Sequence, residues 1–300
     1  MRIAFVGLSA FSMACLEAVL EAGGEVVCVV TIDASLLPHH TDYVDLEPVA
    51  EAQGIPFFRV ENVNEPEAVR RLRESDPDLL FVFGWSQLLK AELLAIPRRG
   101  TVGTHPQLLP QYRGRHQVQW TIALGHDCGG LTFFWIDEGM DTGDILWQEA
   151  FPIGLDDYAA DVYERLVATA VRGIGEFMPR LLAGEEPRTP QQQELATYWP
   201  KRTDEDRVIS WHEPSRKTYD LVRALSRPYI GALARLDGSD VLVWRAAMSA
   251  GPLSPEHAAA PPGTILERRP DGVDVRTGDG YLTLVEVEPD IRSAGAESPR

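Results

Sequence analysis

The sequence is poor in cysteine and has no long hydrophobic run. Only three cysteines, Cys15, Cys28 and Cys128, occur in 300 residues, and no CxxC spacing joins them. This pattern excludes a disulfide framework and a cysteine-based zinc site, and it is typical of the reducing cytoplasm. The opening residues MRIAFVGLSAF lack the basic flank and cleavage site of a signal peptide. No apolar run approaches the roughly 20 residues that span a bilayer. We therefore expect a cytoplasmic protein without a membrane partner.

Basic residues are also scarce. The chain has 28 Lys and Arg against 45 Asp and Glu, a net charge of −17. Proteins that bind nucleic acids present basic surface, because neutralising phosphates and releasing counterions supplies much of their affinity. Anionic membranes attract basic segments for the same reason. The composition therefore predicts no nucleic-acid partner.

The first half of the sequence alternates apolar strand patterns with amphipathic helical ones. The strand patterns are RIAFV, EVVCVVT, IPFFRV, DLLFVFG and TVGTH. Such alternation predicts an α/β domain, a Rossmann-like and mostly parallel sheet flanked by helices. Ligand sites in these sheets lie beyond the carboxyl ends of the strands. Two segments qualify by position, FGWSQLL at 83–89 and THPQLLP at 104–110.

The second half changes character after a long helical pattern that ends at Gly184. A polar, proline-containing stretch follows, and then short strand patterns separated by glycine and aspartate turns. These strands predict a smaller β-rich, barrel-like domain. We predict a catalytic domain over residues 1–185, a linker over 186–205, the small domain over 206–290 and a disordered tail over 291–300.

An acidic loop follows the apolar run LTFFW. It reads IDEGMDTGDIL and contains four carboxylates, Asp137, Glu138, Asp141 and Asp144. Carboxylates that repel one another beside a buried strand are costly unless they are paired or used. One of them beside His105 would orient the imidazole and stabilise its charged form. A divalent cation is the alternative, but the spacing differs from that of a calcium loop, and we predict no metal. Similarly, GLSAF at 7–11 is not GxGxxG and does not imply a dinucleotide.

Two segments together resemble the formyltransferases that use 10-formyltetrahydrofolate. These are HPQLLPQYRGR and GLTFFWIDEGMDTGDIL. The signature is a histidine that opens a leucine–proline–arginine–glycine loop, followed by the aspartate of a DxGxDTGD loop. Here His105 and Asp141 are 36 residues apart, in agreement with that pattern. The segments ATYWPKRTDEDRVISW and LVRALSRPYIGALARL resemble the start of the family's second domain, so the resemblance covers nearly the whole chain.

The resemblance implies transfer of a formyl group from the N10 nitrogen of 10-formyltetrahydrofolate to an amine. It makes His105 the proton-transferring group and Asp141 its partner. The folate would lie against the backbone of the segment after the fourth strand and against the acidic loop. The residues implied are Phe83, Gly84, Trp85, Ser86, Gln87, Leu88, Asp137, Glu138 and Gly139.

One position departs from the family pattern. Two residues before the histidine the family has an asparagine that donates to the oxyanion, and this chain has Gly103. Removing one such donor typically costs about 10²–10³ in rate. A charged His105, a backbone amide or a water would have to replace it. The amino-terminal hydrolase domain of 10-formyltetrahydrofolate dehydrogenase, which this chain also resembles, lacks the same asparagine. The alternatives are therefore a hydrolase of the formyl donor or a folate-binding pseudoenzyme.

The acceptor is predicted from a loop that lacks basic residues. A family member acting on tRNA would need a basic loop after the second strand, and residues 32–47, IDASLLPHHTDYVDLE, contain no Lys or Arg. The string TDYVDL resembles the sugar-modifying branch of the family. We therefore expect a small-molecule amine as acceptor, an amino sugar nucleotide or another natural-product amine, in preference to methionyl-tRNA. Arg113 and Arg115 would either contact an acceptor phosphate or anchor their own loop.

Overall fold

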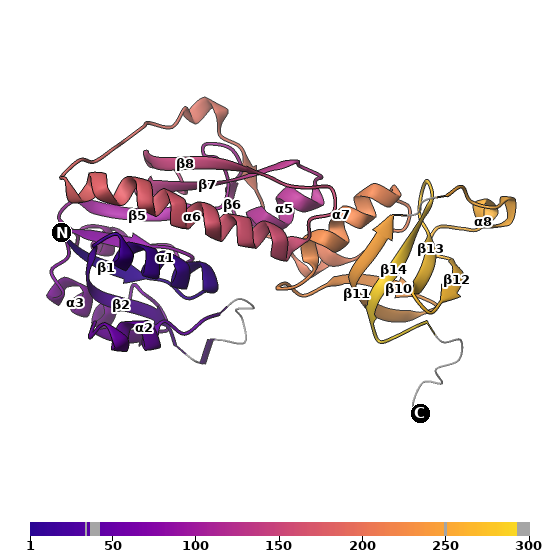
Figure 1. Cartoon of the computed structure of the whole chain (residues 1–300), viewed down its shortest axis with the longest axis horizontal. Coiled ribbons are helices and arrows are strands. Elements are labelled where there is room, and N and C mark those ends of the chain that lie inside the picture. Colours follow the sequence, from indigo (N-terminus) through magenta and orange to yellow (C-terminus); the bar gives the residue numbers. More distant parts are fainter. Residues whose placement is uncertain (34, 37–42, 249–250, 293–300) are drawn as a thin grey trace. The chain divides into compact units, whose positions relative to one another are not determined.

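The computed structural model describes residues 1–33, 35–36, 43–248 and 251–292, and they form two compact units (Figure 1). The first unit comprises Met1–Gly114, Gly129–Phe151 and Glu164–Trp199, and the second comprises Arg115–Cys128, Pro152–Tyr163 and the chain from Pro200 onward. The chain therefore passes between the units several times, which one linker would not produce. The boundaries at 185, 205 and 290 stay predictions. Of the predicted tail, residues 293–300 lie outside the described residues.

A seven-stranded sheet forms the centre of the first unit. Its strands are β1 (Arg2–Val6), β2 (Glu25–Ile32), β3 (Phe57–Val60), β4 (Leu79–Val82), β5 (Gly100–His105), β7 (Cys128–Trp135) and β8 (Ile145–Pro152), in the order β3-β2-β1-β4-β5-β7-β8. Strands β1 to β5 pair in parallel, whereas β7 runs antiparallel to β5. This confirms the predicted mostly parallel sheet. The strand order reverses between β1 and β4, the point at which such sheets bind ligands.

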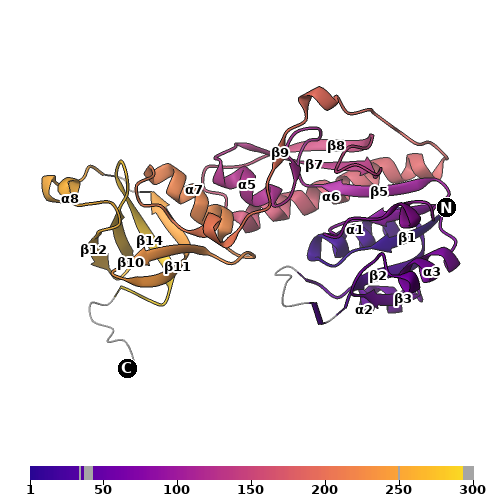
Figure 2. The same ribbon diagram turned by 180° about the vertical axis from the view of Figure 1, so that it is seen from behind.

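Helices cover both faces of this sheet, which explains why its strands are almost continuously apolar. The helices are α1 (Ala10–Glu21), α2 (Glu47–Ala52), α3 (Pro66–Glu74), α4 (Ala91–Leu94) and α6 (Ala159–Leu182). On one face, Leu72 of α3 and Leu93 of α4 join the core with Val82. On the other, the Phe177 ring of α6 packs on Phe133, with ring centroids 4.8 Å apart. Figure 2 shows α2 and α3 beside β2 and β3. No helix among the described residues is long and apolar enough to cross a membrane.

The turn after β1 is hydrogen-bonded to the residue that follows β4. Ser9 caps α1 in a capping box with Ser12, which satisfies donors at the helix N-terminus. The Ser12 hydroxyl also donates to the carbonyl oxygen of Phe83, 2.6 Å away, and accepts from the amide of Leu8. The turn therefore has a structural role: Ser12, directly after the GLSAF segment, holds the residue that follows β4 at the switch point.

The second unit contains a five-stranded antiparallel sheet, as the predicted β-rich domain requires. Its strands are β10 (Ala232–Leu236), β11 (Ser239–Met248), β12 (Ile265–Arg269), β13 (Gly272–Arg276) and β14 (Tyr281–Glu288), in the order β10-β11-β14-β13-β12. The turn between β10 and β11 uses Asp237 and Gly238, both with positive φ, as tight hairpins require. Helices α5 (Gln117–Ala123), α7 (Ser215–Leu225) and α8 (Pro255–Ala259) lie in this unit.

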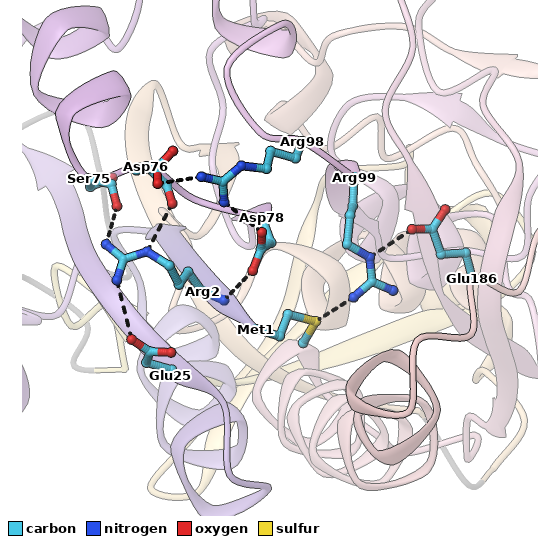
Figure 3. Close-up of polar contacts among 9 residues, drawn as sticks. All are labelled: Met1, Arg2, Glu25, Ser75, Asp76, Asp78, Arg98, Arg99 and Glu186. Atoms are coloured by element: carbon cyan, nitrogen blue, oxygen red, sulfur yellow. Dashed lines mark hydrogen bonds and ion pairs between the residues drawn. The ribbon is translucent and has the colours of Figure 1, made fainter.

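An ion-pair network lies at the amino-terminal edge of the first sheet (Figure 3). The Asp78 carboxylate, 24% exposed, accepts from the main-chain amide of Arg2 and from the Arg98 guanidinium, each at 2.8 Å. These two donors lower the pKa of Asp78. Arg98 also pairs with Asp76, whose side chain is 63% exposed. Asp78 therefore joins the start of β1 to the turn that leads into β5.

We expect Asp78→Asn to lower the free energy of unfolding at pH 7 by about 1–2 kcal/mol, because it weakens two charge-assisted hydrogen bonds. The folded-state pKa of Asp78 is depressed, so its stabilisation exists above the unfolded-state pKa of about 3.9 and is lost as pH falls through the folded value. Urea unfolding between pH 7 and about pH 3 should therefore show the difference from wild type shrinking at acid pH. Asp76→Asn, which alters the exposed partner of the same arginine, should change stability by less than about 0.5 kcal/mol. Equal losses from both substitutions would contradict the assignment.

Candidate active site

His105 is the last residue of β5, and its imidazole is almost fully buried, with 3% exposed. The Nε2 atom lies 2.9 Å from the carbonyl oxygen of Tyr112. A carbonyl only accepts, so Nε2 carries the hydrogen of the neutral ring and Nδ1 keeps its lone pair. Burial lowers the pKa of His105, and Arg113 lowers it further, whereas the Asp141 carboxylate raises it. The resting imidazole is therefore uncharged at neutral pH, with Nδ1 as its basic atom.

The Asp141 carboxylate faces the Nδ1 atom of His105. Its Oδ2 lies 3.6 Å from Nδ1 of His105 and accepts a hydrogen bond from the amide of Gly114 at 3.1 Å. The Asp141 backbone has φ 55°, a left-handed conformation that aspartate tolerates better than most residues. The structure thus brings together the two residues that the paired motif singles out. A carboxylate in this position stabilises an imidazolium once Nδ1 takes up a proton.

His105 and Asp141 come from different kinds of segment: His105 ends a strand, and Asp141 lies in the loop after β7. Because β7 is antiparallel to β5, its last residue Trp135 lies opposite Val102, and it is Thr132 that lies opposite His105. The amide of Ile136 then donates to the carbonyl oxygen of Thr101, at 2.8 Å. The acidic loop therefore leaves β7 near the start of β5 and returns to its end. Asp141 therefore lies beside His105 at the carboxyl end of β5, although β7 itself does not end there.

Gly103 lies two residues before His105, on the same side of β5. A Cβ atom at this position would lie 2.7 Å from Cδ1 of Ile136 and 2.9 Å from its Cγ1. The Ile136 side chain thus fills the space that a larger residue at position 103 would occupy. Packing replaces the polar group there, and no vacant pocket marks the missing side chain.

The residues of the predicted folate segment differ in burial and in the contacts that their side chains make. The Phe83 ring is fully buried and stacks on Phe81 at 4.9 Å, so it belongs to the core. The Gln87 amide is used to bind the loop before α3, through the amide of Val63 and the carbonyl of Glu61. These two side chains are committed within the protein, and contact of the folate with the backbone of this segment stays a prediction.

Gly84 and Trp85 lie at the start of that segment. Gly84 has φ 68° and its amide lies 3.4 Å from Oγ1 of Thr104. The Nε1 of Trp85 is buried and has no hydrogen-bond partner in the described chain, which leaves a donor for a polar ligand. Ser86 and Leu88 are exposed.

The acidic loop is internally braced. Oδ1 of Asp137 accepts from the amide of Gly139 at 3.0 Å and from Oγ1 of Thr142 at 2.6 Å. Glu138 and Gly139 are exposed. Among the described residues, no three histidine, cysteine or acidic side chains gather as ligands of one metal ion.

A segment that the sequence pattern assigns to a linker completes the site. We call residues 187–199 the strap. Its strand β9 (Tyr198–Trp199) pairs with β6 (Arg113–Gly114), and a 3₁₀ turn, η2, covers Gln193–Leu195. The buried guanidinium of Arg113, 1% exposed, donates to Oε1 of Gln191 at 2.6 Å and to Oε1 of Gln193 at 2.7 Å. Of the two roles open to Arg113, the structure gives it loop anchoring.

The strap also contacts the acidic loop. Nε2 of Gln191 donates to the carbonyl oxygens of Asp141 and Gly143, at 2.9 and 2.7 Å. Sequence reasoning missed this residue, because glutamines in a proline-containing polar stretch are typical of exposed connections.

The comparisons with known proteins cover most of the chain. Residues 1–177 match the formyl transferase family, and residues 201–296 match the formyl transferase C-terminal domain. A methionyl-tRNA formyltransferase from Symbiobacterium thermophilum is 35% identical over 96% of this chain and 88% of its own. One from Citrifermentans bemidjiense is 33% identical over 96% of this chain and 89% of its own.

A solved structure resembles the fold at lower identity. The N-formyltransferase from Helicobacter canadensis, in complex with folinic acid and dTDP-3-aminofucose, superposes with a TM-score of 0.69. It is 17% identical, and the match covers 95% of this chain and 99% of that one. At this identity the likeness concerns the fold alone.

These findings overturn the predicted acceptor. The expectation of a small-molecule amine and of no nucleic-acid partner is wrong, because the relatives that match along nearly the whole chain are methionyl-tRNA formyltransferases. The hydrolase and pseudoenzyme alternatives are set aside with it, since these relatives are named as transferases. The predicted family and formyl donor are confirmed. The chain is an enzyme of the formyltransferase family that uses 10-formyltetrahydrofolate.

Proposed function

We propose that this enzyme transfers the formyl group of 10-formyltetrahydrofolate to the α-amine of methionyl-tRNA. The observation that carries the proposal is the match along 96% of the chain to curated enzymes of that name. Such an acceptor is made in the cytoplasm, the compartment that the sequence predicts.

Local charge supports a tRNA partner despite the net charge of −17. Residues 200–248 contain nine Lys and Arg against seven Asp and Glu, and they include two of the chain's three lysines. Three cations, Arg202, Arg115 and Lys201, act on His116 and, after burial, are the next causes that lower its pKa. Cations that converge on one position attract a phosphate, whatever the sum over the rest of the chain.

We expect the purified enzyme to formylate methionyl-tRNA, detected as formylmethionine by mass after base hydrolysis of the ester. The rate at low tRNA concentration should fall as salt rises, because salt screens the phosphate contacts. Lys201→Ala should raise the KM for tRNA by about tenfold without changing the KM for the formyl donor.

Lys217→Ala is the matched control. It removes the same charge from an exposed lysine of the same segment, but one already paired with Glu213 at 2.9 Å, and it should leave the KM for tRNA unchanged. Formylation of an amino sugar nucleotide, with none of methionyl-tRNA, would refute the proposal.

The site offers the groups that the formyl donor needs. When bound, 10-formyltetrahydrofolate supplies the electrophilic formyl carbon. The Trp85 indole N–H is buried and has no hydrogen-bond partner among the described residues. This group and the Gly84 backbone at the switch point would hold the polar ring of the folate. Gly84 has no room for a side chain, because a Cβ there would lie 2.5 Å from Oγ of Ser12. The exposed residues Glu138 and Gly139 would border the ring from the acidic loop.

His105 would act as the proton acceptor. Its Nδ1 keeps a lone pair because Nε2 is committed to Tyr112, so Nδ1 takes the proton that the attacking α-amine loses. Asp141 stabilises the imidazolium so formed, and the proton can then be passed to the leaving nitrogen. General-base catalysis of this kind contributes about 10²–10⁴ in rate.

We expect His105→Ala and Asp141→Asn each to lower kcat by at least about 10², and the double variant to lose little more, because the two residues act as one unit. The wild-type rate should fall at acid pH, where Nδ1 becomes protonated. In Asp141→Asn this fall should move to lower pH, since the carboxylate raises the pKa of His105. Additive losses, or an acid limb that stays in place, would remove the pair from the mechanism.

Gly103 leaves the developing oxyanion without a side-chain donor. The charged form of His105 would provide the compensating positive charge, because the imidazolium forms as the amine attacks.

We expect Gly103→Asn to lower both thermal stability and kcat, because its side chain overlaps Ile136. Overpacking of this kind typically costs about 1–3 kcal/mol. The double variant Gly103→Asn/Ile136→Ala makes room and should recover both quantities relative to the single one. Differential scanning fluorimetry and steady-state kinetics test this, with Ile136→Ala alone as the control. A single variant as stable and active as wild type would show that the space is open.

A further inference from the structure

We propose that Gln191 of the strap is a positioning residue, which holds Asp141 against His105 through the backbone of the acidic loop. The proposal rests on the proposed function in one respect, the use of the His105–Asp141 pair in proton transfer. The geometry of the contact is independent of the acceptor.

Both the oxygen and the nitrogen of the Gln191 side-chain amide have hydrogen-bond partners that determine its orientation. Its Oε1 accepts from Arg113, which has only donors, and its Nε2 donates to the carbonyls of Asp141 and Gly143, which only accept. The amide therefore has one orientation that satisfies all its partners. The side chain is 7% exposed, and hydrogen bonds away from water are stronger and more costly to lose.

Gln191 contacts the turn around Asp141, where the backbone is in a sparsely populated conformation. Asp141 is held in the left-handed region, at φ 55°, and its carboxylate accepts a hydrogen bond from the amide of Gly114. The carbonyls on both sides of Thr142 converge on one Nε2 atom. Gln191 thus holds the turn from the backbone side while Gly114 holds the carboxylate, and together they set the 3.6 Å between Oδ2 and Nδ1 of His105.

Gln193 is a natural control within the same strap. It also accepts from Arg113, at 2.7 Å, and it also donates to the acidic loop, to the carbonyl of Thr142 at 3.2 Å. It differs in being exposed and in not contacting Asp141. In either Gln→Met variant, Arg113 keeps the other glutamine and the Tyr198 hydroxyl as acceptors, and the net charge does not change.

We expect Gln191→Met to lower kcat by about tenfold or more, because small displacements of reacting groups cost up to about 10² in rate. The KM values for methionyl-tRNA and for the formyl donor should stay within about twofold, since Gln191 is proposed to touch neither. Gln193→Met should behave as wild type in both respects. Equal losses from the two variants would overturn the proposal.

The decisive readout is the titration of His105, followed by NMR of its imidazole in the substrate-free full chain. Asp141 and Arg113 are the charged groups that act on this ring, and neither is replaced. If Gln191→Met lets the carboxylate withdraw, the pKa of His105 falls further, whereas a merely structural role would leave it unchanged. An unchanged value would refute the positioning role. Because this measurement needs no acceptor, it stands even if methionyl-tRNA fails as substrate.

Gln191→Glu separates donation to the acidic loop from anchoring of Arg113. It keeps an acceptor for the buried guanidinium and removes the donor to Asp141 and Gly143, and it carries the test should Gln191→Met not fold. A kcat as low as that expected of Gln191→Met supports the proposal. A wild-type kcat would show that anchoring of Arg113 is what matters and would overturn it.

Discussion

A buried imidazole resists protonation, so His105 can serve as a base only if a carboxylate is held at a fixed distance from it. Desolvation lowers the pKa of His105 and the Asp141 carboxylate opposes that effect. The carboxylate has its own cost, since it follows a left-handed backbone and faces an acceptor atom in the resting state. Three features together maintain the distance between Oδ2 of Asp141 and Nδ1 of His105. They are the register of β5 against β7, the Gly114 amide and the strap. Much of the first unit can be understood as the scaffold that maintains this distance.

The direction of β7 explains why so much scaffold is needed. In a fully parallel sheet, two strand ends on one edge bring their loops together without further help. Here β7 ends opposite Val102, and the acidic loop must return to reach His105. The parallel part of the sheet could be predicted, because each strand is a short apolar run beside a helical pattern. The reversal of β7 and the docking of the strap could not, because both depend on pairing between residues far apart in the sequence, such as Gly114 with Trp199.

Position 103 shows how packing and chemistry become coupled inside a site. From the sequence, Gly103 indicates only a missing donor. The structure adds that Ile136 fills the space, so the loss of a polar group is matched by the gain of apolar contacts with the core beneath the loop. Interiors have few voids larger than a water molecule, and a glycine in a sheet therefore implies a neighbour that approaches it. The sequence places Ile136 at the start of the acidic loop but carries no signal of which strand position it covers.

The acceptor was the feature least accessible from composition, for a reason that lies in electrostatics. The net charge adds every residue equally, yet beyond about 10 Å charges in water are largely screened from one another. A phosphate bound near His116 would respond to the charges that act there, Arg115, Lys201 and Arg202 with Asp206 opposing them, and hardly to more distant carboxylates. The fold itself carries no preference, since an N-formyltransferase solved with an amino sugar nucleotide has a similar one. Under the proposed function, the choice of acceptor would depend on where a few cations gather, and the proton-transfer site could stay the same while that arrangement varies.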